Sequence, residues 1–150
     1  MVTEEPYPLK VVDIARPEEG AQLFIPSFHS TVRAGFPSPA EDYIEKKLDI
    51  NELVVEHPAA TFFVKVEGDS MIDAGIHSGD ILVVDRSVEA KSGKIVVAVV
   101  NGEFTVKRLK IDSKGVFLLP ENPRYPPIQI EEGSECFVWG VVSYIIHKAL

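Results

Sequence analysis

The sequence predicts a mainly β protein: a curled multi-stranded sheet or small barrel, with one or two short helices and an extended N-terminal arm. From Thr61 onward, short apolar and β-branched runs are separated by frequent turn signals. Asn101 and Gly102 lie between two such runs, and an Asn-Gly pair in that position is a strong β-hairpin signal. Little of the sequence has a helical pattern, which favours the all-β class.

The first segment, residues 1–34, differs from the rest of the chain. Prolines interrupt it, and its apolar residues occur in clusters without a sustained helical period. This segment is too apolar for a plain linker. It is also too short, and too often interrupted in its helical pattern, for a helix-turn-helix domain. We therefore expect an extended arm that lies on another surface, where it can add a strand.

A short helix is predicted over residues 39–48. Ser38 is a good N-cap, Pro39 fits the first helical position, and Glu41 completes a capping box. The apolar side of this helix is expected to cover an edge of the sheet.

The remaining elements are predicted to be strands. Phe62, Val64 and Val66 alternate with the residues between them, which is the period of a strand. The later runs are short, rich in Val and Ile, and bounded by turns, and we find no internal repeat. The expected strands cover residues 62–67, 81–84, 94–100, 103–107, 116–119, 128–130 and 137–146.

Composition limits the compartment and the partners. The formal net charge is −8, which argues against direct binding to nucleic acid because such binding needs a basic face. No apolar run approaches the ~20 residues that a membrane helix requires, and the N-terminus is acidic, unlike a signal peptide. Cys136 is the only cysteine, which is consistent with a reducing compartment. We expect a cytoplasmic protein without a membrane partner.

No cofactor or metal is expected from the sequence. The histidines are far apart along the chain, and no carboxylate or cysteine lies near them at ligand spacing. There is no Gly-rich phosphate loop. The histidines are interpreted as surface or loop residues: His29, His57, His77 and His147.

Ser70 is the candidate nucleophile. Gly68 and Asp69 end the strand over residues 62–67, so Ser70 lies on the turn that follows. A serine in such a turn can expose its Oγ while nearby backbone N–H groups face an incoming oxyanion, although most turns of this kind are only turns.

Lys107 is the candidate base for Ser70. None of the histidines lies in a strand-end context that favours a Ser-His pair, so the remaining option is a lysine that loses its proton through desolvation. Lys107 lies within an apolar strand, next to Val106. The plain alternative is an edge or solvent-facing lysine, which is the common role of lysine in strands.

Four blocks of sequence resemble the LexA/UmuD family of self-cleaving Ser/Lys peptidases. The four blocks occur in the same order as in the family, and the resemblance covers roughly residues 34–148. Ser70 and Lys107 match the nucleophile and general base of the family, at a similar spacing. The blocks are Gly-Asp-Ser-Met (68–71), Gly-Asp-Ile-Leu-Val-Val-Asp (79–85), Gly-Glu-Phe-Thr-Val-Lys-Arg-Leu (102–109) and Leu-Leu-Pro-Glu-Asn-Pro (118–123).

The resemblance also implies a substrate, which is the chain itself. The family cuts between a small residue and a glycine upstream of the catalytic domain, and Ala34 and Gly35 match that bond. The expected parts are an arm over residues 1–34, removed by self-cleavage, and a LexA-like peptidase and dimerisation domain over residues 35–150. The backbone N–H groups of Asp69 and Ser70 are the expected oxyanion donors.

Residues 36–43, which follow Gly35, resemble the UmuD branch of the family. The segment before Ala34 is too short to hold the DNA-binding domain of a repressor. The implied role is in SOS mutagenesis after DNA damage. Cleavage would be stimulated by the RecA filament on single-stranded DNA, and the product would be a homodimer serving an error-prone, UmuC-type translesion polymerase. Three alternatives stay open: a non-catalytic β-barrel interaction module, a phage or plasmid homologue, and a signal-peptidase-like enzyme.

Overall fold

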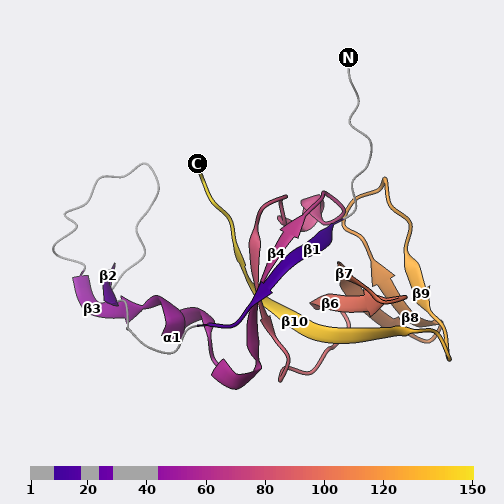
Figure 1. Ribbon diagram of the computed structural model, residues 1–150, viewed down its shortest axis with the longest axis horizontal. Coiled ribbons are helices and arrows are strands. Elements are labelled where there is room, and N and C mark those ends of the chain that lie inside the picture. Colours follow the sequence, from indigo (N-terminus) through magenta and orange to yellow (C-terminus); the bar gives the residue numbers. More distant parts are fainter. Residues whose placement is uncertain (1–8, 18–23, 29–43) are drawn as a thin grey trace, which may run out of the picture.

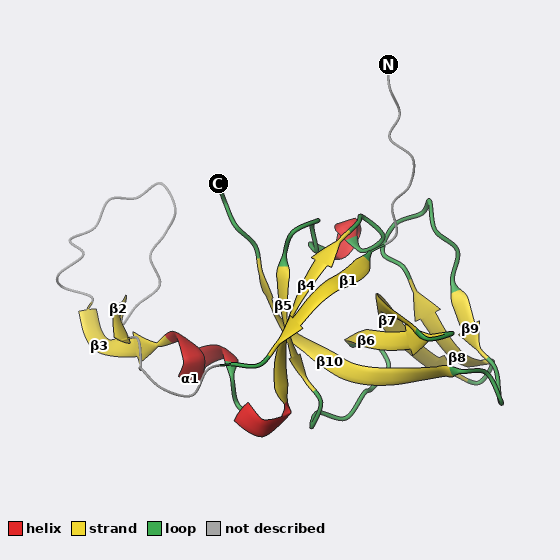
Figure 2. Cartoon of the chain, viewed as in Figure 1, coloured by secondary structure: helices red, strands yellow, loops and turns green. Residues whose placement is uncertain are grey.

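The computed structural model describes residues 9–17, 24–28 and 44–150, and strands dominate these parts of the chain (Figures 1 and 2). The first elements are β1 (Lys10–Ala15), β2 (Phe24–Phe28), β3 (Ile44–Asp49) and α1 (Ile50–Val54). The others are β4 (Thr61–Glu67), β5 (Ile81–Asp85), β6 (Ile95–Val100), β7 (Glu103–Asp112), β8 (Gly115–Leu119), β9 (Ile128–Ile130) and β10 (Cys136–Ile146), with short 3-10 turns at Pro58–Ala60 and Ile72–Ala74.

The main sheet has 8 strands in the order β1-β4-β5-β10-β6-β7-β8-β9, with every neighbouring pair antiparallel. A further pairing between Lys10 of β1 and Thr105 of β7 joins one edge of the sheet back to a strand near the other edge. The sheet therefore curls into a ring, and β8 and β9 extend it beyond β7. The predicted curled β architecture is confirmed.

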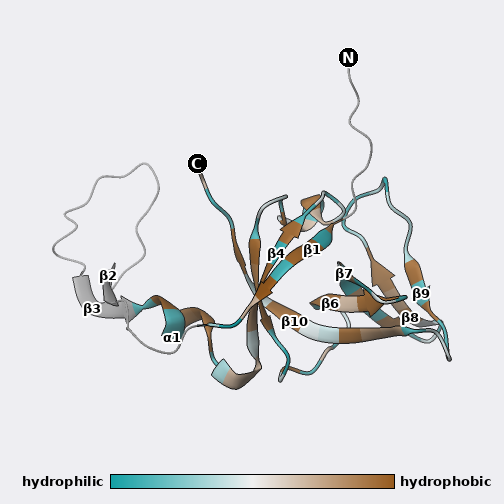
Figure 3. Ribbon diagram, viewed as in Figure 1, coloured by the Kyte–Doolittle hydropathy of each residue, from teal (hydrophilic) through white to brown (hydrophobic). Residues whose placement is uncertain are grey.

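The core lies inside this curled sheet. One cluster of buried residues packs between β4, β5 and β7 and includes Leu9, Val64, Val66 and Met71. A second cluster joins β6, β7, β8 and β10. Figure 3 shows hydrophobic residues concentrated on the strands and hydrophilic residues in the loops. The predicted strands after Thr61 are all present, and the hairpin at Asn101 and Gly102 joins β6 to β7.

The arm prediction is confirmed for the part that the structure describes. Lys10–Ala15 forms β1 and adds to the sheet beside β4, in antiparallel register. The ladder shifts between Val11 and Asp13, where a β-bulge interrupts it. The arm thus closes the ring that contains the candidate site.

The predicted helix over residues 39–48 is wrong in its second half. Ile44–Asp49 is strand β3, which pairs with β2 in a small separate sheet, and residues 39–43 lie outside the described residues. A capping box contributes only about 1 kcal/mol, so pairing with a distant strand can override it. The helix starts later, at Ile50, where the Asp49 side chain accepts a hydrogen bond from the Asn51 N–H at 3.0 Å.

Candidate active site

Ser70 lies in the tight turn that follows β4, with no exposed surface. Gly68 has a φ of 114°, a conformation that side-chain-bearing residues rarely adopt, and its N–H donates to Ser78 Oγ at 3.2 Å. The next residue, Met71, is fully buried in the core. The turn is therefore fixed on both sides of Ser70.

Hydrogen bonds from the segment after β8 hold the turn that contains Ser70 in place. The Glu121 N–H donates to the Ser70 carbonyl at 2.9 Å, and the Asn122 side-chain amide donates to the Asp69 carbonyl at 3.0 Å. The Tyr125 hydroxyl donates to the Asp69 carboxylate at 2.5 Å. Burial, followed by this contact with Asp69, raises the pKa of Tyr125 to about 12, so the phenol stays protonated as a donor.

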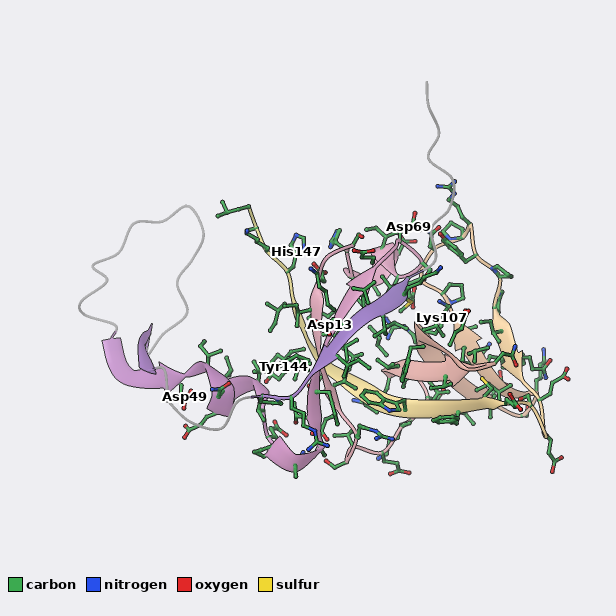
Figure 4. All side chains as sticks on the ribbon, viewed as in Figure 1. Asp13, Asp49, Asp69, Lys107, Tyr144 and His147 are labelled. Carbon is green, nitrogen blue, oxygen red and sulfur yellow. The ribbon has the colours of Figure 1, made fainter. Side chains whose placement is uncertain are left out.

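Lys107 is brought directly to Ser70 by strand β7. Its Nζ donates to Ser70 Oγ at 3.2 Å, to Thr105 Oγ1 at 3.0 Å and to the Val106 carbonyl at 3.1 Å. All these acceptors are neutral oxygens, and within the described residues Lys107 takes part in no ion pair. In the view of Figure 4, Lys107 and Asp69, the neighbour of Ser70, both lie in the right-hand half of the molecule.

Burial shifts Lys107 toward its neutral form, compared with a lysine in water. The residue is only 5% exposed, and burial lowers the pKa of its ammonium from the ordinary 10.5 to about 8. At pH 7 about one Lys107 side chain in ten is then neutral and able to accept a proton. A solvent-facing lysine, the alternative considered from the sequence, is not what the structure contains.

The backbone around Ser70 also offers donors. Neither the Asp69 N–H nor the Ser70 N–H donates a hydrogen bond to any residue that the structure describes. The carbonyls of both residues are engaged with the segment after β8, so the peptide planes are held in place. Such N–H groups are suited to an oxyanion that forms next to Oγ.

Leu9, directly before β1, covers the candidate nucleophile Ser70. The Leu9 N–H donates to Ser70 Oγ at 3.0 Å, and the Leu9 side chain is 1% exposed. Leu9, Lys107 and Tyr125 help to line a pocket of about 690 Å³ beside the site. Ser70 Oγ therefore lies between a donor from the arm and a donor from the body of the domain.

The other predicted residues fall in two groups. Ala34, Gly35 and His29 lie outside the described residues. The remaining histidines do not bond to Ser70: His57 pairs with Asp85, while His77 and His147 both contact Asp80. The interpretation of these three histidines as surface residues is confirmed, but the expectation that no carboxylate lies near them is wrong. Asp80 is only three residues from His77, and the fold brings His147 to Asp80 and Asp85 to His57.

Sequence reasoning gave no role to Asn122 or Tyr125. Asn122 lies within the block at residues 118–123, which resembles the family, but the sequence alone gives no physical reason for this residue. Its contact with the Ser70 turn supplies that reason. Tyr125 has no local pattern that could have identified it.

None of the helices in the described ranges is both long and apolar enough to cross a membrane.

Comparison with known proteins matches residues 26–143 to the family model described as Peptidase S24-like. Protein SamA of Salmonella typhimurium is 47% identical over 135 residues, covering 90% of this chain and 94% of that protein. Protein MucA of Escherichia coli is 46% identical over 121 residues, covering 80% of this chain and 82% of that protein. LexA repressor 1 of Pseudomonas syringae is 42% identical over 135 residues, covering 89% of this chain and 64% of the repressor. The chain belongs to the S24-like peptidases and is a UmuD-like member of the LexA/UmuD family.

Proposed function

We propose that the protein is a self-cleaving serine peptidase of the SOS response, which cuts its own chain between Ala34 and Gly35. The observation that carries this proposal is the hydrogen bond from Lys107 Nζ to Ser70 Oγ at 3.2 Å, made by a buried lysine. A buried lysine without an anionic partner is costly in free energy, and proteins retain such groups mainly where they have a function.

In the proposed reaction, neutral Lys107 takes the proton from Ser70 Oγ as this oxygen attacks the Ala34 carbonyl carbon. The N–H groups of Asp69 and Ser70 stabilise the oxyanion of the tetrahedral intermediate. The Ala34–Gly35 bond then breaks, and Lys107 passes its proton to the leaving amine of Gly35. A water molecule, deprotonated by Lys107, hydrolyses the ester and restores Ser70.

Cleavage of a tethered bond needs a restraint, because the effective concentration of the substrate is high. The hydrogen bond from the Leu9 N–H to Ser70 Oγ supports such a restraint, because Ser70 is covered while β1 lies in this position. For the cut, β1 would move away from Ser70 so that the Ala34–Gly35 bond can enter the site, and a partner that favours this arrangement would trigger cleavage. By family resemblance that partner is the RecA filament on single-stranded DNA.

The product over residues 35–150 is proposed to act in the cytoplasm as a homodimeric accessory subunit of an error-prone, UmuC-type translesion polymerase. The similarity to proteins SamA and MucA over most of their length supports this part of the proposal. The acidic net charge of −8 for the whole chain favours contact with DNA through partners instead of directly.

The test is the intact mass of the purified chain after incubation at pH 9, and separately with RecA filaments at pH 7.5. A fragment with the mass of residues 35–150, absent for Ser70→Ala, would support the reaction, the bond and the nucleophile together. An intact wild-type chain under both conditions would favour the non-catalytic interaction module.

The bond itself is tested by replacing Gly35 with tryptophan. A bulky side chain next to the cut should prevent the backbone from entering the site, so this variant should stay whole while its circular dichroism spectrum is unchanged. Cleavage of Gly35→Trp at the wild-type rate would show that another bond is used.

A further inference from the structure

A second cluster of reactive side chains lies away from Ser70, where the turn before β5 meets the segment after β10. It consists of His77, Asp80 and His147. Within the described residues, it is the one group of three or more His, Cys, Asp or Glu residues whose ligand atoms come together. Figure 4 shows His147 on the segment that leads from β10 to the C-terminus, apart from Lys107.

The centre of this cluster is the buried carboxylate of Asp80, whose side chain is 2% exposed. Its Oδ1 lies 2.6 Å from His147 Nδ1, and its Oδ2 lies 3.8 Å from His77 Nδ1. The two imidazole rings face the same region, with their centroids 4.6 Å apart. One ligand atom from each residue lies within 4.8 Å of the others.

The distances between the ligand atoms, from 2.6 Å to at most 4.8 Å, lie on both sides of the separation expected in a metal site. Ligands that surround Zn²⁺ at about 2.0 to 2.1 Å in a tetrahedron are roughly 3.3 Å from one another. The imidazoles of His77 and His147 are 47% and 51% exposed, so both rings can turn by the small amount required. Solvent can reach the same side, and water could complete the coordination.

The Asp80 carboxylate is held in one orientation by hydrogen bonds. Its Oδ2 accepts the backbone N–H of His77 at 2.8 Å, which fixes the carboxylate plane, and its own N–H donates to the His77 carbonyl at 3.1 Å. The Val66 N–H donates to the Asp80 carbonyl at 3.1 Å and ties the turn to β4. Hydrogen bonds of this kind around a ligand orient it and strengthen metal binding.

A hydrogen-bonded pair of histidine and aspartate does not by itself require a metal. The chain contains such a pair in His57 and Asp85, with His57 Nδ1 2.5 Å from the carboxylate. The cluster at Asp80 differs because a second imidazole faces the same carboxylate. Two imidazoles and one carboxylate are a donor set that suits Zn²⁺, Ni²⁺ or Co²⁺ better than Mg²⁺ or Ca²⁺.

We propose that His77, Asp80 and His147 bind one divalent transition-metal ion, with Zn²⁺ the best fit, and that this ion ties the C-terminal segment to the turn before β5. The proposal does not depend on the peptidase reaction. It uses none of the residues assigned to that reaction.

The experiment is a titration of the full-length chain with Zn²⁺ in competition with a chromogenic chelator. All variants carry Cys136→Ser, which removes the thiol as a competing ligand. We expect one equivalent of Zn²⁺ to bind, and His77→Gln and His147→Gln each to weaken binding at least tenfold. His57→Gln is the matched control, because it removes an exposed imidazole from a carboxylate that has no second histidine.

The melting temperature gives an independent readout. Zn²⁺ should raise it for the parent chain and for His57→Gln, but not for His77→Gln or His147→Gln. Two results would overturn the proposal. One is a parent chain that does not compete with the chelator for Zn²⁺, and the other is binding that His77→Gln and His147→Gln reduce no more than His57→Gln does.

Discussion

Two strands meet at Ser70, and they are held in very different ways. β7 pairs with β6 and β8 along its two edges and buries Val106, Lys107 and Leu109. β1 pairs with β4 through a bulged ladder, meets β7 at one residue pair, and leaves Val12 46% exposed. β7 is thus a fixed part of the domain, whereas β1 can leave with less loss of structure. The fixed strand supplies the proposed base, and the strand with fewer pairings follows the residue that covers the proposed nucleophile.

The largest expected effect comes from removing either member of the pair at Ser70. Ser70→Ala and Lys107→Ala should each slow self-cleavage by about 10³-fold or more, because the nucleophile or its base is gone. Intact mass over time at pH 9 measures this rate. Lys110→Ala is the control, since Lys110 is on the same strand but pairs with Asp112 near the surface. Equal loss in Lys110→Ala would mean that the assay reports the fold of β7 instead of its chemistry.

The pH dependence of cleavage is the next effect. Because the reactive form of Lys107 is neutral and its pKa is about 8, the rate should rise about tenfold per unit below pH 7.5 and level off above pH 8 to 9. The measurement is the first-order rate constant between pH 6 and 10, without RecA. A rate that keeps rising to pH 10 would indicate a base with the ordinary pKa of lysine.

The same residue should lower the stability of the fold. Between about pH 8 and 10.5 the unfolded chain holds a proton on Lys107 that the folded chain has lost, so unfolding becomes harder as pH rises through this range. Lys107→Met should therefore raise the free energy of unfolding at pH 7 by about 1 to 3 kcal/mol, and by less at pH 10. Urea unfolding at the two pH values measures the difference. A Lys107→Met variant that is less stable than wild type at pH 7 would contradict this.

The contrast between the strands also explains what the sequence could predict. β7 follows from local signals: the turn at Asn101 and Gly102 and the apolar run on each side of it. The contact of Lys107 with Ser70 depends on the curl of the whole sheet. The exclusion of the histidines makes Lys107 a candidate base, and the family resemblance favours that role over a solvent-facing lysine. β1 could be expected as a strand-adding arm, but its partner strand could not, because long-range pairing leaves no pattern in the arm itself.

The histidine cluster and β3 show the same limit. His77 and His147 are far apart in sequence and meet only because β5 pairs with β10. The capping box before residue 39 predicts a helix as far as residue 48, but Ile44–Asp49 is a strand, and the helix begins at Ile50, after the Asp49 cap. The local capping rule therefore predicts a helix where pairing with β2 produces a strand, and the tertiary pairing overrides it.

The smallest expected effect tests the covering strand. Leu9→Pro removes the N–H that donates to Ser70 Oγ, whereas Leu9→Ala keeps this donor and loses most of the same buried side chain. A single hydrogen bond contributes about 0.5 to 1.5 kcal/mol, so Leu9→Pro should cleave itself roughly two- to tenfold faster than Leu9→Ala at pH 9.

The comparison of these two variants separates the donor from the packing, because both weaken the hold of Leu9 on the core. If the two cleave at the same rate, the hydrogen bond does not restrain Ser70, and β1 acts through packing alone. If Leu9→Pro is slower, the start of β1 helps to build the active site. That result would reverse the roles assigned here to the two strands.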